Sequence, residues 1–113
     1  MSDPTSLTIA ELRDGIAARQ FKAREVAEAY NDAVIAARML NAYTVETPDD
    51  ALPAADAADA GQTKGALAGI PLGIKDLFAT RGVDSTAGSN ILRGFKPTYE
   101  STVTANLRQA GAG

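Results

Sequence analysis

The chain has 113 residues, with eleven Lys and Arg against fourteen Asp and Glu, so its formal net charge is −3. Hydrophobic residues make up 45% and charged residues 22%, a balance typical of a folded globular protein. The charge argues against a basic phosphate-binding surface, and the absence of Cys and His excludes disulfides, thiol catalysis, Cys/His zinc sites and Ser-His-Asp triads within these residues. No secretory signal opens the chain and no stretch approaches the roughly 20 apolar residues of a membrane span, so a soluble cytoplasmic protein is expected.

The front of the chain, about residues 8–40, is predicted to be helical. Thr8 opens a Thr-x-x-Glu capping box, and apolar residues then recur at helical intervals, so a helix is expected over 8–19 despite an unfavourable interior Gly15. A second helix over 23–38 has one apolar stripe, but no Ser, Thr, Asp or Asn stands before it as a cap. Two such helices with a short join predict an antiparallel helical hairpin.

The rear, about residues 41–113, is predicted to mix strands and helices. The expected elements are a strand over 42–46, a helix from 47 to 60, a buried strand over 70–75, an irregular loop over 80–90 and a helix over 101–110. This order favours an α/β layer in which helices cover a mixed sheet. Two strands are too few for an isolated sheet, so the fold is expected to be incomplete. The alternative is a small α+β domain closed by oligomerisation.

Lys75 is the candidate catalytic residue. It ends an apolar stretch and precedes Asp76, Leu77 and Phe78, so its neighbourhood is expected to be largely dry. Burial lowers the pKa of an ammonium group, and Ser-Lys arrangements activate a hydroxyl without histidine. The alternative is a lysine at a strand end that points into solvent or pairs with Asp76.

The sequence around Lys75 also resembles a known family. Residues 67–78, Leu-Ala-Gly-Ile-Pro-Leu-Gly-Ile-Lys-Asp-Leu-Phe, and residues 86–89, Thr-Ala-Gly-Ser, are similar to the amidase signature family. The Pro-x-x-x-Lys-Asp core is family-wide, and its continuation resembles the branch of tRNA-dependent amidotransferases. The similarity runs from about Leu7 to Gly113 and implies that residues 1–113 are the N-terminal portion of a single amidase domain.

The resemblance implies a Ser–cis-Ser–Lys triad in which Lys75 is the base. It would act through a bridging serine that activates the nucleophilic serine. Both serines belong to a downstream segment of Gly-Gly-Ser-Ser-Gly-Gly-Ser type, which this chain lacks. Ser85, Ser89 and Ser101 are interpreted as turn, loop and cap residues. The 113 residues alone are therefore expected to have no glutaminase activity.

The resemblance also implies what the complete enzyme does. Its glutaminase subunit would release ammonia from glutamine, and the complex would use ATP to convert Glu-tRNA(Gln) or Asp-tRNA(Asn) to Gln-tRNA or Asn-tRNA. The implied partners are the B and C subunits of the amidotransferase, with the misacylated tRNA bound through the former. No cofactor or metal is expected in this chain, since ATP and magnesium serve the full complex. The alternatives are a stand-alone amidase that acts on small amides and a non-catalytic binding module.

Overall fold

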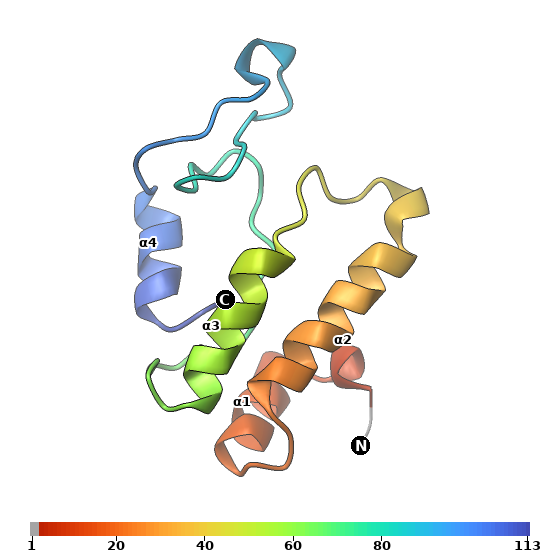
Figure 1. Cartoon of the computed structure of the whole chain (residues 1–113), viewed down its shortest axis with the longest axis vertical. Coiled ribbons are helices and arrows are strands. Elements are labelled where there is room, and N and C mark those ends of the chain that lie inside the picture. Colours follow the sequence, from red (N-terminus) through yellow and green to blue (C-terminus); the bar gives the residue numbers. More distant parts are fainter. Residues whose placement is uncertain (1–2) are drawn as a thin grey trace.

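The computed structural model describes residues 3–113. Met1 and Ser2, which belong to the segment expected not to be a secretory signal, lie outside the described residues. The described chain is elongated, with extents of 46 × 31 × 20 Å. Its α-helices are α1 (Ile9–Ala17), α2 (Ala23–Ala36), α3 (Pro48–Asp59) and α4 (Thr102–Gln109), joined by short 3-10 helices at Pro4–Ser6, Arg38–Leu40 and Asn90–Leu92 (Figure 1). The four predicted helices are thus confirmed.

Local capping explains where α1 and α4 begin. The backbone N–H of Glu11 donates to Thr8 Oγ1 at 3.2 Å, as a capping box requires. The Glu11 side chain reaches back to Thr8 as predicted, but its Oε1 accepts the Thr8 hydroxyl, at 3.1 Å, in place of the Thr8 backbone N–H. At α4, Ser101 Oγ accepts the N–H of Thr104 at 3.2 Å. Gly111 then adopts a φ of +94°, a conformation that ends the helix and that glycine adopts readily.

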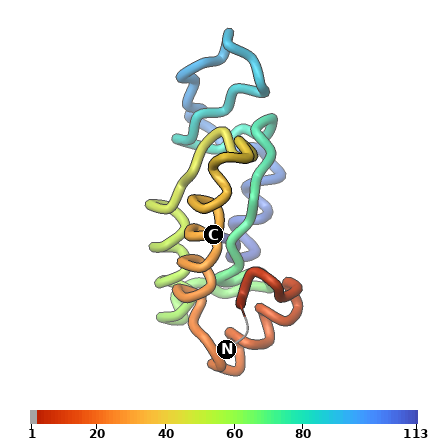
Figure 2. The backbone as a smooth tube through the Cα atoms, turned by 90° about the vertical axis from the view of Figure 1, so that its right-hand side faces the viewer, coloured from red at the N-terminus to blue at the C-terminus, as the bar shows by residue number. Residues whose placement is uncertain are grey.

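The main helix pair is α2 with α3, which run antiparallel and side by side (Figures 1 and 2). The prediction that α1 and α2 pair in an antiparallel hairpin is therefore wrong, because the main partner of α2 is α3. The cause is side-chain size: Ala23 and Ala27 of α2 and Ala55 of α3 are buried against each other and let the two backbones approach closely. Helix α1 adds Leu12 to a second cluster, with Phe21, Val26 and Ile70.

No strand forms within residues 3–113, so the predicted strands over 42–46 and 70–75, and with them the mixed sheet, are corrected. A strand needs a paired neighbour, and residues 42–46 are exposed with no ladder partner. Residues 70–72 have only a single pairing partner. The N–H of Gly113 donates to Ile70 O at 3.0 Å and the N–H of Leu72 donates to Gly113 O at 3.1 Å, which is the pattern of one parallel β-bridge.

Candidate active site

The segment that carries Lys75 has no regular secondary structure. It leaves the buried Ile70 and makes a turn after Lys75, where the N–H of Phe78 donates to the Lys75 carbonyl oxygen at 3.0 Å. The irregular loop predicted over 80–90 follows, and the part around residues 85–95 projects away from the helices (Figures 1 and 2). The site therefore lies on loop backbone that must be held in place by side chains.

Lys75 itself is exposed, so the described residues agree with the alternative of a lysine that points into solvent and not with the expected dry neighbourhood. Its ammonium group makes no ion pair or hydrogen bond with any side chain of residues 3–113. The alternative in which Lys75 pairs with Asp76 is also not found, because the Asp76 carboxylate bonds to Thr86 instead. Within the described chain, Lys75 is a free cation.

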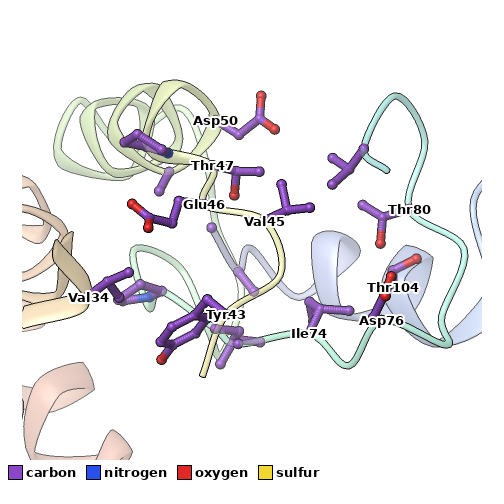
Figure 3. Close-up of a pocket in the computed structure, with 18 of the residues that line it drawn as sticks. Val34, Tyr43, Val45, Glu46, Thr47, Asp50, Ile74, Asp76, Thr80 and Thr104 are labelled. Atoms are coloured by element: carbon purple, nitrogen blue, oxygen red, sulfur yellow. The ribbon is translucent and has the colours of Figure 1, made fainter. Parts of the chain in front are cut away.

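Lys75 and Asp76 line a groove of about 350 Å³. Four stretches of chain surround it: Val34 of α2, the segment from Tyr43 to Asp50, the segment with Ile74, Asp76 and Thr80, and Thr104 of α4 (Figure 3). Tyr43, Val45 and Ile74 supply apolar side chains that remain 52%, 39% and 41% exposed. The groove thus combines an apolar wall with one unpaired ammonium group.

An ion pair holds the wall of the groove that contains Tyr43 and Val45. Arg38 binds the Glu46 carboxylate through two hydrogen bonds, Nε to Oε2 at 2.9 Å and Nη2 to Oε1 at 2.8 Å. The hydrogen bond from Arg38 lowers the pKa of Glu46 below its ordinary value. This bidentate contact closes the loop between α2 and α3, where the backbone makes no ladder.

Asp76 is bound on three sides by the loop ten residues ahead. Its Oδ1 accepts the Thr86 N–H at 2.8 Å, its Oδ2 accepts the Thr86 hydroxyl at 2.5 Å, and its carbonyl oxygen accepts the Ala87 N–H at 3.2 Å. The side-chain hydrogen bond from Thr86 is the main cause of a lowered Asp76 pKa. Ala87 has a φ of +50°, which an alanine adopts only when its surroundings hold it there.

The start of α4 supports the same loop from the other side. The carbonyl oxygen of Ala79 accepts the Ser101 N–H at 2.8 Å and the Thr104 hydroxyl at 3.2 Å. Glu100 accepts the Arg81 N–H at 2.6 Å through Oε2 and pairs with Arg108 Nε at 2.6 Å through Oε1. The chain after Lys75 is therefore anchored to a helix as well as to Thr86.

The three serines of the rear have structural positions. Ser85 lines the groove but is buried, and its hydroxyl donates to Val83 O at 3.1 Å. Ser89 Oγ accepts the Ile91 N–H at 3.2 Å, and Ser101 caps α4. None of these hydroxyls is bonded to Lys75 within residues 3–113. Residues 3–113 therefore hold a candidate base without a serine hydrogen-bonded to it.

Sequence reasoning missed the hydrogen bonds between Asp76 and Thr86, because no spacing pattern points to them. An Asp followed ten residues later by a Thr in a Gly- and Ser-rich loop is common and predicts no contact. The only sequence indication was that both residues fall inside the two stretches with family resemblance, 67–78 and 86–89.

Acidic side chains can form a metal site, and a long apolar helix can span a membrane. No group of three or more His, Cys, Asp or Glu side chains within residues 3–113 is arranged to hold a metal ion. In the same part of the chain, no helix is long and apolar enough to cross a membrane.

Residues 25–113 match the family model described as Amidase. The match covers most of the chain, and the chain therefore belongs to the amidase family. It is 59% identical, over 99% of its length, to the A subunit of glutamyl-tRNA(Gln) amidotransferase from Rhodopseudomonas palustris (strain TIE-1). It is 55% identical, over 100% of its length, to the corresponding protein of Sphingopyxis alaskensis. The chain spans 23% and 24% of the length of these two relatives.

A solved structure is also similar to this chain. It is described as the inhibitor-bound form of an unexpected vestigial protein complex that reveals the evolutionary origins of an s-triazine catabolic enzyme. The likeness has a TM-score of 0.86 at 34% identity and covers 94% of this chain and 24% of that one. The helices and loops of this chain are therefore arranged as in the matching part of that solved chain.

Proposed function

We propose that this chain is the N-terminal portion of the glutaminase subunit, known as the A subunit, of a tRNA-dependent amidotransferase. The observation that supports this most is the 59% identity over 99% of the chain. Because the chain spans 23% of that relative, the activity, substrates and partners of the whole protein are part of the proposal. In this proposal, Lys75 is the catalytic residue that this chain supplies to the site of amide hydrolysis.

The proposed reaction is the hydrolysis of the side-chain amide of glutamine. A serine oxygen attacks the amide carbon, the C–N bond breaks, ammonia leaves, and water then cleaves the acyl-serine ester to give glutamate. Lys75 takes the proton of the nucleophile through a bridging serine and returns it to the leaving nitrogen. Both serines come from outside these 113 residues, so the residues alone are proposed to be inactive.

The released ammonia is used by partner subunits in this proposal. The B and C subunits complete a heterotrimer, and the first of them binds the misacylated Glu-tRNA or Asp-tRNA. In this proposal, ATP and magnesium are used by the full complex, and the complex acts in the cytoplasm.

The proposal is tested by replacing Lys75 in the full-length protein in complex with its partners. Lys75→Ala is expected to lower the rate of glutamate release from glutamine at least 1,000-fold, on the order of the effect of removing a member of a catalytic triad. Lys75→Arg is expected to fail as well, because an arginine side chain does not lose its proton at working pH.

Lys64→Ala is the matched control, because Lys64 does not line the groove. It should keep the wild-type rate. The circular dichroism spectra of all variants should agree. Near-normal turnover of Lys75→Ala would show that Lys75 is not the base.

A second candidate is a stand-alone amidase that acts on another small amide. It is favoured by the 34% identity to the chain associated with an s-triazine catabolic enzyme. The higher identity to the amidotransferase relatives places it second. Amide hydrolysis without the B and C subunits, together with no turnover of glutamine, would decide for this alternative.

A further inference from the structure

The position of the Lys75 side chain must be set through its backbone. Its ammonium group has no side-chain partner within residues 3–113, and the residue is exposed. The Lys75 carbonyl oxygen accepts the Phe78 N–H at 3.0 Å, and the next residue, Asp76, has its side chain held by hydrogen bonds. These contacts therefore decide where Lys75 lies.

Both acceptor groups of Asp76, its carboxylate and its carbonyl oxygen, are occupied by the loop 86–87. The carboxylate accepts two hydrogen bonds from Thr86, at 2.8 and 2.5 Å, and the carbonyl oxygen accepts the Ala87 N–H at 3.2 Å. Asp76 is partly buried, whereas Lys75 on one side and Leu77 on the other are exposed. Asp76 is therefore a side chain held by the loop, between two neighbours whose side chains are exposed.

The Thr86 hydroxyl links the two segments. It donates to Asp76 Oδ2, and its oxygen accepts the Gly88 N–H at 3.3 Å, so the same group closes the turn of its own loop. Ala87, between them, is held at a φ of +50°. Loss of this one hydroxyl would release both the turn and the carboxylate.

We propose that Asp76 and Thr86 form a positioning pair that aims Lys75 into the groove. The pair acts through Lys75 and does not itself touch the substrate. This inference rests on the proposed function of Lys75 as the base. It goes further by assigning a role in amide hydrolysis to two residues outside the triad.

The test compares three variants of the full-length protein in complex with its partners. Thr86→Val keeps the shape of the side chain and removes the hydroxyl donor, whereas Thr86→Ser keeps the donor. Ser89→Ala is the matched control, because it removes another hydroxyl from the same loop. The Ser89 hydroxyl oxygen accepts the Ile91 N–H and does not bond to Asp76. For each variant, kcat and KM for glutamine, the fraction of folded protein and the midpoint of thermal unfolding are measured.

We expect Thr86→Val to lower kcat per folded site at least tenfold with KM changed by less than twofold. Thr86→Ser should restore kcat to within threefold of wild type, and Ser89→Ala should leave it unchanged. A purely structural role would lower the folded fraction and leave kcat per folded site intact. That result, or equal losses in Thr86→Val and Thr86→Ser, would overturn the positioning role.

The proposed function is tested separately by the wild-type protein and Lys75→Ala. If the wild type hydrolyses another amide in a Lys75-dependent way and does not hydrolyse glutamine, the assignment to the amidotransferase fails. The comparison of Thr86 variants on that amide then still decides the positioning role. If no amide is hydrolysed in a Lys75-dependent way, both proposals fail together.

Discussion

Gly15 shows how one missing side chain shapes the core. It is a poor helix former in the middle of α1, and the sequence marks it only as unfavourable. In the structure it is buried, and a Cβ built there would lie 2.3 Å from Cζ and 2.4 Å from Cε1 of Phe21. The Phe21 ring therefore occupies the place of the absent side chain. Gly15 supports the core although it weakens the helix.

We predict that Gly15→Ala destabilises the protein by about 1 kcal/mol. Overpacking against Phe21 costs about 1–3 kcal/mol and exceeds the roughly 1 kcal/mol that alanine gains in a helix. In a Phe21→Leu background, where the aromatic ring is gone, the same substitution should be neutral or stabilising. Urea unfolding of the four variants in this cycle measures the free-energy differences.

Gly73→Ala serves as the control, because nothing lies within 4 Å of a Cβ built at Gly73. It should change the free energy of unfolding by no more than about 0.5 kcal/mol. A Gly15→Ala substitution that stabilises both backgrounds equally would show that helix propensity, and not contact with Phe21, decides at this position.

At the scale of elements, α2 begins with a cap that its own sequence does not contain. Lys22 stands at the N-cap position and makes no side-chain cap hydrogen bond. The Asp59 carboxylate, at the end of α3, accepts the N–H groups of Ala23 at 2.8 Å and Arg24 at 3.0 Å instead. It also places a negative charge at the positive end of the α2 dipole. The antiparallel pairing of α2 and α3 therefore supplies the missing cap.

We predict that Asp59→Ala lowers the free energy of unfolding by about 1–2 kcal/mol, since two N–H groups lose their acceptor. Lys22→Ser should recover roughly 1 kcal/mol in that background, because Lys22 has the extended backbone of an N-cap, with φ −93° and ψ 150°. In the presence of Asp59 the same serine should add much less. Chemical denaturation of the four proteins in this cycle gives the coupling energy.

Equal effects of Lys22→Ser in both backgrounds would show that Asp59 does not cap α2. The matched control is Asp56→Ala, one turn earlier on α3. The Asp56 carboxylate pairs with the exposed Arg24 side chain at 2.8 Å and with no backbone N–H. Its removal should cost less than about 1 kcal/mol.

Elements whose signals are local could be predicted from the sequence. The caps of α1 and α4, Thr8 and Ser101, lie within three residues of the groups they bind. The strands could not be predicted correctly, because an extended segment becomes a strand only beside a partner, and residues 70–72 find only Gly113. The packing of α2 on α3 depends on contacts between alanines of the two helices. The spacing of apolar residues within one helix does not show which other helix it packs against.

The part of the site that could be predicted from the sequence is the identity of its candidate catalytic residue. Lys75 was identified from its surroundings in the sequence and by resemblance, and the structure puts it in the wall of a groove. Its exposure agrees with the alternative of a lysine that points into solvent and not with the expected dry neighbourhood, because neighbours that are apolar in the sequence, such as Leu77, are themselves exposed. The hydrogen bonds between Asp76 and Thr86 join two loops, and loop geometry is not encoded by periodicity.

At the scale of the whole molecule, much of the apolar surface is left uncovered. Around the groove, Tyr43, Val45 and Ile74 remain partly exposed, and in two of the 3-10 helices Met39 and Ile91 are 88% and 92% exposed. A concave cluster differs from single exposed side chains, because only the cluster can enclose an apolar molecule.

We predict that the 113-residue chain binds the apolar dye ANS in the groove. The double variant Val45→Gln and Ile74→Gln should lower the dye fluorescence at least twofold, because it replaces two apolar walls with neutral polar ones. The control double variant, Met39→Gln and Ile91→Gln, removes more exposed apolar surface outside the groove and should have little effect. Equal losses in the two double variants would contradict binding in the groove.

The single bridge between residues 70–72 and Gly113 has a consequence for the order of folding. It closes a long loop that contains α4 and the projecting segment, and the entropy lost on closing a loop increases with loop length. Helices α2 and α3 are joined by a much shorter connection and pack with little such loss. The helix pair should therefore be established first, and the two hydrogen bonds of Gly113 should be among the last to form and the first to break.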